Sequence, residues 1–479
     1  MLKNFLKAGF GGVVSQAVNL LSMPIISRLY TPEVYALWAI VMATAGIFGS
    51  IACFRYELAI VMPKEEEEAS SIFWWCVISS IGMGLIVALV AQMPWLQKFI
   101  ITETVGNEWF YSLFVPLLVT TMGLTLALQY WNVRQQGYAL NSFAQVALAV
   151  VTLILQVAWT IKYSASSVGL LIGSLGGQFA ALLLLLIGTL YIGRHPKISE
   201  HILRGMPYTL KRQRLFFLYS TPYTLFGAAR VRASIFILEY FLTSREVGLY
   251  AFASRIMNFP VSLISNVLRP VLFQEAASKG IKSLEYKINQ ILKWLAVISI
   301  PFVVFYFFYA KELFVLFFGE KWAGSGFIGK FLILPVFTFL FCNWMDRIMD
   351  IMGKQRLVLI LEIVFASMSI CGLWLGFALR LGLSGALLIQ CIILIAYNIV
   401  YLYIAYDKAG YNKIKLYQLL YQGIIWACIY STLLFILKWL LTDILAILLY
   451  FVIIVAIFLW FGKSLYTIFY KRIITENTT

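Results

Sequence analysis

Charged residues are scarce in this sequence, making up 12% of its 479 residues where a soluble domain holds about a quarter. Hydrophobic residues reach 62%, against about half in soluble chains. The apolar runs are long and continuous, whereas strands of a transmembrane barrel are about 10 residues long and alternate in polarity. The composition therefore excludes a soluble globular protein and a barrel, and predicts an all-α polytopic membrane protein.

Residues that build metal sites, disulfides and nucleotide sites are also few. The six cysteines lie inside apolar runs without paired spacing, and both histidines, His195 and His201, share one basic loop without ligand partners. Only four aspartates occur, none in an Asp-x-Asp metal motif. The triplet GKS at residues 462–464 ends an apolar run rather than following a glycine-rich loop. We therefore expect no metal, no cofactor and no enzymatic activity.

Polar and charged breaks divide the chain into about 14 apolar segments, each near the ~20 residues that cross ~30 Å of hydrocarbon. We expect the first to be a retained span rather than a cleaved signal peptide. The predicted spans are residues 8–27, 35–62, 71–93, 110–131, 139–161, 167–193, 215–242, 247–272, 291–309, 327–351, 357–379, 383–406, 417–437 and 443–462.

Lysine and arginine are unevenly distributed between the two sides of these spans. Alternate connections hold 23 basic residues and the other connections hold 8. Because cytoplasmic loops carry the excess, both termini are predicted to be cytoplasmic, and much of the +16 net charge would face anionic lipid rather than nucleic acid.

The outer connections are too short for a catalytic domain, which argues against a glycan polymerase or ligase. The acidic run at residues 65–68 precedes a predicted cytoplasmic helix start, where it suits the helix dipole.

A short internal repeat follows the first and the seventh spans. The stretches LYTPEVYALWA and FLTSREVGLYA place Glu33 and Glu246 213 residues apart. The repeat predicts two pseudo-symmetric six-helix bundles in parallel orientation, with two helices appended. We expect an N-terminal bundle at residues 1–193, a cytoplasmic linker at 194–214, a C-terminal bundle at 215–406 and an appended two-helix segment with a tail at 407–479.

Several charged side chains fall inside predicted spans. The stretch FGAARVRASIFILEYFLTS carries Arg230, Arg232 and Glu239, of which the last two share a helix face. At the repeat offset Arg232 lies opposite Asn19, and because parallel repeats bind substrate between the halves, we expect both to face one cavity. In the second span, helical geometry would point Arg55 and Glu57 to opposite sides.

A polar stripe marks the eighth span. Six residues fall within an arc of about 100° and extend over about 21 Å; they are Arg255, Asn258, Ser262, Ser265, Asn266 and Arg269. Such a stripe must face water or protein, so we expect it to line a cavity. Arginine outnumbers carboxylate there, which favours an anionic, phosphorylated passenger.

Two purely structural interpretations of these charged residues stay open. The arginines near span ends could snorkel to the interface, and Arg230 or Arg232 could pair with a buried carboxylate such as Glu239. Three further charges, Lys330, Asp346 and Glu362, lie near predicted span ends and are expected at the interface.

Residues 27–69, SRLYTPEVYALWAIVMATAGIFGSIACFRYELAIVMPKEEEEA, resemble the start of the polysaccharide-transporter family, the O-antigen flippases of Wzx type. The later stretch EVGLYAFASRI resembles the same family. The resemblance implies the fold of the multidrug/oligosaccharidyl-lipid/polysaccharide (MOP) exporters, two six-helix bundles around a central cavity.

The same resemblance implies a flippase of the bacterial inner membrane. Its substrate would be an undecaprenyl-diphosphate-linked oligosaccharide, moved from the cytoplasmic to the periplasmic leaflet by alternating access, with a polysaccharide polymerase and a chain-length regulator as further candidate partners. Arg55 and Arg255 match cavity arginines by position, while Arg232, Arg269, Asn19 and Asn258 follow from the repeat and the stripe. Glu57 and Glu239 are candidate proton carriers for coupling to the proton gradient or membrane potential.

Two other exporters of this fold remain as alternatives. The appended thirteenth and fourteenth spans depart from the twelve-span O-antigen pattern and resemble longer relatives, including the peptidoglycan-precursor flippases. A drug or cation antiporter is the second alternative, and it would favour acidic residues in the cavity.

Overall fold

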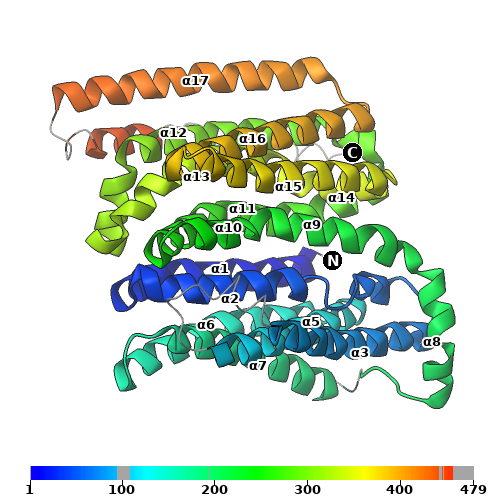
Figure 1. The fold of residues 1–479 in the computed structure, drawn as a ribbon. Coiled ribbons are helices and arrows are strands. Elements are labelled where there is room, and N and C mark those ends of the chain that lie inside the picture. The colour runs from blue at the N-terminus through cyan, green and yellow to red at the C-terminus, as the bar shows by residue number, and fades with distance from the viewer. Residues whose placement is uncertain are drawn as a thin grey trace. The chain divides into compact units, whose positions relative to one another are not determined.

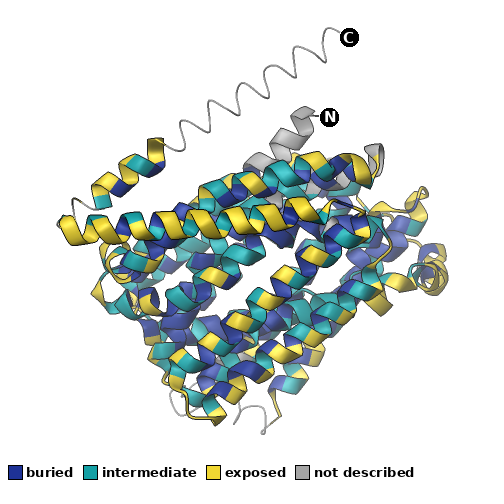
Figure 2. Ribbon diagram, turned by 90° about the horizontal axis from the view of Figure 1, so that it is seen from above, coloured by how far each residue is buried: buried dark blue, intermediate teal, exposed yellow. Residues whose placement is uncertain are grey.

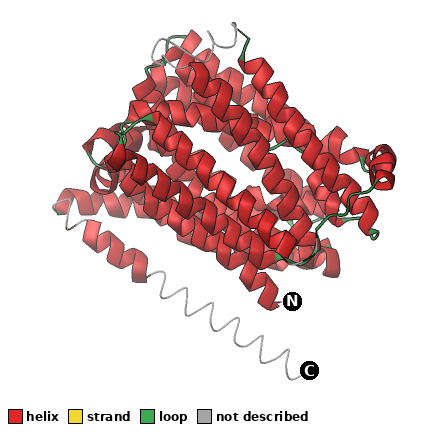
Figure 3. Cartoon of the chain, turned by 90° about the horizontal axis from the view of Figure 1, so that it is seen from below, coloured by secondary structure: helices red, strands yellow, loops and turns green. Residues whose placement is uncertain are grey.

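The computed structural model describes residues 2–93, 108–191, 193, 195–441, 445 and 447–456. Every regular element in this part of the chain is helical (Figure 3). Eleven of the described helices are long and apolar enough to cross a membrane. The predicted all-α, multi-pass membrane fold is therefore confirmed. The count of about 14 spans stays a prediction, and the last predicted span, 443–462, falls partly outside the described residues.

The helices follow one another with short connections (Figure 1). In chain order they are α1 (Leu2–Leu29), α2 (Pro32–Gly49), η1 (Tyr56–Val61), α3 (Glu66–Ala91), α5 (Glu108–Arg134), α6 (Tyr138–Lys162), α7 (Ser167–Tyr191), α8 (Glu200–Arg212), η2 (Phe216–Ser220), α9 (Thr221–Arg232), α10 (Ser234–Phe241), α11 (Ser244–Lys279), η3 (Ile281–Leu284), α12 (Glu285–Phe318), η4 (Glu320–Trp322), α13 (Ala323–Cys342), η5 (Asn343–Met345), α14 (Asp346–Ile351), α15 (Gln355–Ala378), α16 (Gly382–Ala409) and α17 (Lys413–Leu440).

Contacts between helices divide the chain into two compact units. The first comprises Met1–Ser278 and Lys311–Ala405, and the second comprises Lys279–Ala310 and Tyr406–Thr479. Both sets of residues bearing the internal repeat belong to the first unit. The division into bundles at residues 193 and 215 stays a prediction.

Three predicted spans are interrupted. The second ends as an α-helix at Gly49 and resumes as η1, the seventh is divided into η2, α9 and α10, and the tenth into α13, η5 and α14. The break in the second span follows from left-handed backbone at Phe54 and Arg55, with φ of 49° and 61°. Hydropathy alone misses such breaks because the side chains on either side remain apolar.

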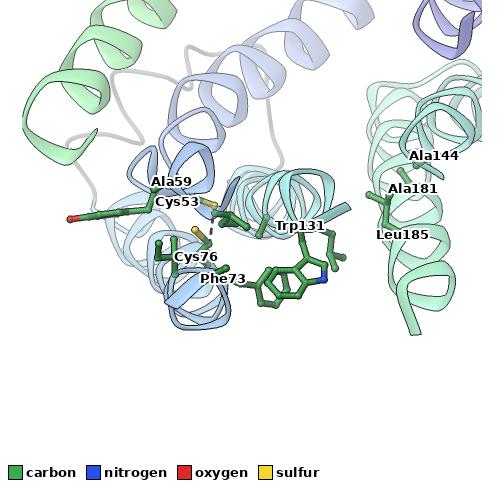
Figure 4. Packing of buried hydrophobic residues seen from close by; sticks show 14 residues of the cluster. Cys53, Ala59, Phe73, Cys76, Trp131, Ala144, Ala181 and Leu185 are labelled. Carbon is green, nitrogen blue, oxygen red and sulfur yellow. Dashed lines mark hydrogen bonds between the residues drawn. The ribbon is translucent and has the colours of Figure 1, made fainter. Parts of the chain in front are cut away.

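The first seven helices pack through apolar side chains and small residues. One cluster joins Phe73 and Cys76 of α3 to Trp131 of α5 and Leu185 of α7 (Figure 4). Many helices alternate between buried and exposed positions along their length (Figure 2). The exposed positions include many large apolar side chains, such as Leu89, which is 70% exposed, as lipid-facing helices require.

The turn between α1 and α2 packs tightly against α11 and η4. A Cβ atom on Gly248 would lie 1.8 Å from the carbonyl oxygen of Pro32. The Trp322 indole donates a hydrogen bond to the Ser27 carbonyl at 2.8 Å and stacks on Phe252 at 4.0 Å. We call this contact between residues 27–35 and residues 245–252 and 321–322 the turn seam.

Replacing Gly248 should therefore destabilise the protein. Gly248→Ala forces the Pro32 backbone away, and overpacking of this kind costs about 1–3 kcal/mol. Thermal unfolding of the detergent-purified protein measures the effect. The matched control is Gly82→Ala in α3, where nothing lies within 4 Å of the added methyl group. Equal melting temperatures for the two variants would contradict the tight approach.

Candidate functional site

Arg255 of α11 reaches across to α2. Its guanidinium donates a hydrogen bond to the Tyr35 hydroxyl at 3.1 Å and lies 5.0 Å from the centre of the Trp38 ring. Both partners are neutral, so the aromatic contact and the hydrogen bond leave the positive charge uncompensated. Tyr35 itself is fully buried, which fixes its hydroxyl in place.

Arg232 ends α9 and packs against a different part of α2. Its Nε and Cζ atoms lie 2.5 and 2.8 Å from where a Cβ on Gly46 would be, so any larger residue at position 46 would displace the guanidinium. Arg232 forms no hydrogen bond or ion pair with another residue that the structure describes. It is a second arginine without a carboxylate partner among those residues.

The two arginines meet the same face of α2. Tyr35 and Gly46 are 11 residues apart, which places them within about 20° around the helix and about 16 Å apart along it. The sequence pattern identified Arg232 and Arg255 separately but could not show that one helix aligns them. The sequence feature that could have indicated this alignment is Gly46, a small residue in an apolar helix.

Three other buried or half-buried arginines are neutralised by carboxylates. Each ion pair lies within 3.1 Å: Arg55 with Glu57 at 3.0 Å, Arg230 with Glu362 at 2.7 Å and Arg269 with Asp346 at 3.1 Å. Arg269 also donates to the Asn343 carbonyl and side-chain oxygens, each at 2.9 Å. Arg269, predicted to line a cavity, is thus held by η5 and α14.

The prediction that Arg55 and Glu57 point to opposite sides is wrong. It assumed a continuous helix, whereas the left-handed backbone of Arg55 and the start of η1 bring the two side chains together. Glu57 is 1% exposed. Arg55 Nε and Glu57 Oε2 are buried without a hydrogen-bond partner among the described residues, so this ion pair is incompletely satisfied.

Glu362 is also placed differently from the prediction. It was expected at the interface, yet it lies about two turns into α15 and is 1% exposed. Arg230 donates to it through Nε, and the Tyr397 hydroxyl donates to its other oxygen. The Arg230 guanidinium lies 4.5 Å from the Tyr397 ring and 5.3 Å from the Phe339 ring. Sequence reasoning proposed Glu239 as a partner, and missed Glu362 because 132 residues separate it from Arg230.

The remaining candidate residues form no hydrogen bond or ion pair with the aligned arginines in the part of the chain that the structure describes. Asn258 donates to the Ser254 carbonyl of its own helix at 2.8 Å, and Asn19 is half-buried on α1. The described contacts do not join Asn19 to Arg232, because Arg232 lies against α2. Glu239 is 5% exposed on α10. Of the polar stripe, the Asn266 side chain lies outside the described residues.

Metal ligands do not converge in the part of the chain that the structure describes, where no three His, Cys, Asp or Glu side chains lie together. The chemistry offered by the site is cationic. It consists of hydrogen-bond donors from arginine, with aromatic and hydroxyl groups beside them.

Comparison with solved structures defines the class of protein. The lipid II flippase MurJ, in an inward closed conformation, aligns over 98% of this chain and 99% of its own length with a TM-score of 0.70 and 14% identity. An inward-facing multidrug resistance MATE transporter of the MOP superfamily aligns over 83% of this chain and 98% of its own, with a TM-score of 0.63 and 16% identity. The protein therefore has the fold of the MOP transporters.

The family follows from the sequence. The profile of the polysaccharide biosynthesis protein family matches residues 25–326, so the chain belongs to that family. A MOP superfamily transporter from Pyrococcus furiosus, described as having a binding pocket of reversed polarity that suggests a different function, aligns over 85% of this chain and 96% of its own, with a TM-score of 0.57 and 14% identity. Comparison with curated proteins gives no match.

The buried ion pair of Arg230 yields a stability prediction. Glu362→Ala leaves an uncompensated buried cation and should lower the free energy of unfolding by about 3–5 kcal/mol, measured by unfolding in detergent. Replacing both partners, with Arg230→Met and Glu362→Leu, should recover most of that loss. Glu200→Ala, which breaks an exposed pair with Arg204, is the control and should change stability by no more than about 1 kcal/mol. A double variant as unstable as Glu362→Ala would refute this account.

Proposed function

We propose that this protein is a flippase for an undecaprenyl-diphosphate-linked oligosaccharide, an O-antigen or related surface polysaccharide repeat unit. In this proposal the substrate passes from the cytoplasmic to the periplasmic leaflet of the bacterial inner membrane by alternating access. The observation that carries it is the pair Arg232 and Arg255, two arginines aligned on one face of α2 without a carboxylate partner.

The excess of arginine over carboxylate in the predicted spans supports an anionic substrate. An arginine at the centre of a membrane helix costs about 2.5–3.5 kcal/mol on the insertion scale. Arg55, Arg230 and Arg269 recover that cost through carboxylates, while Arg232 and Arg255 have none. A diphosphate would supply the missing charge, and the planar guanidinium suits phosphate oxygens.

The spacing of the two arginine contacts along α2 supports movement of the substrate in steps. Contacts about 16 Å apart on α2 lie at different depths of the membrane. A diphosphate would meet Arg232 and Arg255 in turn, while hydroxyl and amide groups such as Tyr35 and Asn258 would bind the glycan. The other predicted cavity residues, Arg55, Arg269 and Asn19, are proposed as flanking contacts.

The contacts at the turn seam support a conformation of the transporter that is closed on the outer side and open toward the cytoplasm. The distribution of basic residues predicts that Arg28, Arg245 and Lys321 lie on the outer side, with both termini inside. These residues sit at the seam, where Lys321 donates to the Arg28 carbonyl at 3.0 Å and Arg245 lies 3.8 Å from Glu33. In the proposed cycle the seam opens to release the substrate outward.

Three arginine-paired carboxylates favour this function over a cation antiporter. A cation site needs carboxylates that are available to a ligand, yet Glu57, Glu362 and Asp346 are each paired with arginine. A peptidoglycan-precursor flippase remains the second candidate, since the fold of MurJ covers nearly the whole chain. The lipid that accumulates without the protein would distinguish the two. Transport within the polysaccharide pathway also makes a polymerase and a chain-length regulator reasonable partners.

The central test removes the two aligned charges. In a host lacking the gene, a complete polyprenyl-diphosphate oligosaccharide should accumulate and be cleared by the wild-type protein, as measured by mass spectrometry of extracted lipids. Arg232→Gln with Arg255→Gln should reduce clearance at least about 100-fold, because two charge-assisted contacts of about 1.5–3 kcal/mol each are lost.

The matched control is Arg356→Gln, which removes an exposed arginine at the start of α15. It should clear the lipid as the wild type does. Accumulation of a peptidoglycan precursor would select the second candidate. Full clearance by the double variant, at wild-type protein levels, would refute the role of the aligned arginines.

Coupling to protons yields a separate prediction. We propose Glu57 and Glu239 as proton carriers, because both are buried and Glu57 has one carboxylate oxygen without a hydrogen-bond partner among the described residues. Glu57→Gln with Glu239→Gln should abolish transport driven by a pH gradient in proteoliposomes while binding of a radiolabelled lipid diphosphate persists. Unchanged gradient-driven transport would rule out both residues.

A further inference from the structure

The helix α8, in the connection between the two predicted halves, is fixed on the side of α3. Ile202, Met206 and Thr209 form its buried stripe, with exposed fractions of 4%, 8% and 5%. The Ser71 hydroxyl donates to the Ile202 carbonyl at 3.2 Å. The Trp74 indole donates to the Lys197 carbonyl at 2.9 Å, just before α8.

The acidic run at the start of α3 secures the same connection. Glu66 pairs with Lys197 at 3.5 Å, and Glu68 pairs with Arg212 at 2.8 Å. His201 lies 3.8 Å from Glu67. The run does begin a helix, as predicted, but its side chains also bind both ends of the linker, so the rotation of α8 about its axis is fixed.

The contacts on α3 show where α8 lies relative to the membrane. They involve residues 66–74, the first two turns of an apolar span, and so extend over about 12 Å from its polar end. Figure 1 shows α8 running across the direction of α3 rather than parallel to it. The helix therefore lies beside the polar end of α3, where a membrane-spanning helix meets the headgroup region, and its opposite side looks away from α3.

That opposite side combines basic and apolar side chains. Residues 204, 208 and 211 of α8 fall within an arc of about 60°. Residues 214 and 215 follow the turn at Gln213 that ends the helix. All five are exposed; they are Arg204, Tyr208, Lys211, Arg214 and Leu215. Arg204 pairs with Glu200, whereas Lys211 and Arg214 form no ion pair with a described residue. Tyr208 and Leu215 are 72% and 62% exposed.

We propose that this face of α8, together with residues 214 and 215 that follow the helix, binds anionic phospholipid headgroups of the adjacent leaflet. Lys211 and Arg214 would pair with phosphate groups, while Tyr208 and Leu215 enter the boundary between headgroups and acyl chains. A helix lying in the plane of the membrane with basic and apolar residues on its free side is suited to anionic lipid. The depth of α8 beside α3 favours lipid over a soluble protein partner. The inference does not rest on the flippase proposal.

Hydrogen exchange of the full-length protein in nanodiscs tests this inference. Amides of residues 204–218 should exchange more slowly in nanodiscs containing phosphatidylglycerol than in nanodiscs of phosphatidylcholine alone. Each basic residue near a charged surface contributes about five-fold to binding, so Lys211→Gln with Arg214→Gln should remove roughly 30-fold of the protection.

The control removes two exposed basic residues from another connection, with Lys354→Gln and Arg356→Gln, and should retain the full lipid effect. Equal exchange of the wild type in both lipids would overturn the proposal without reliance on any variant. Slow exchange that persists in Lys211→Gln with Arg214→Gln would also overturn it. Equal exchange together with cross-linking of Lys211 to a soluble protein in cells would assign the face to a protein partner instead.

Discussion

The removal of arginine from water is the constraint on which the arrangement of this protein depends. A guanidinium in an apolar helix needs a carboxylate, a set of neutral acceptors or a ligand. Arg55, Arg230 and Arg269 have carboxylates. The Arg255 guanidinium contacts Tyr35 and Trp38, and the Arg232 guanidinium packs against α2 at Gly46. The arginines thus differ in whether a carboxylate among the described residues compensates their charge.

The three pairs also show how helices from distant parts of the sequence are held together. Arg230 joins α9 to α15, and Arg269 joins α11 to the segment after α13. Breaking a buried pair costs more than forming it gains, because one charge is left behind in a medium that cannot solvate it. Such pairs specify which helices meet, while small residues and apolar side chains supply the close packing.

Much of the fold was accessible from the sequence, and less of the site was. Continuous apolar runs determine spans because lipid leaves the backbone no alternative to helices, which is why the membrane class was predicted correctly. The family was predicted from the wording of residues 27–69 and of the later stretch EVGLYAFASRI. The polar stripe identified Arg255 and Arg269 alike as cavity residues, and that role stays a prediction. The stripe could not separate Arg255 from Arg269, because the difference lies in Asp346 and Asn343, which are 74 to 77 residues away. The pairing of Arg55 with Glu57 depends on left-handed backbone that no side-chain periodicity reveals.

The turn seam is built largely from backbone acceptors. The carbonyls of Ser27 and Arg28 receive Trp322 and Lys321, and Gly248 rests on the carbonyl of Pro32. A peptide carbonyl neither titrates nor changes with the side chain that it carries. The acceptors of these hydrogen bonds therefore depend neither on protonation nor on the identity of the side chains at residues 27 and 28, whereas the ion pair of Arg245 with Glu33 is a part of the seam that depends on side-chain charge.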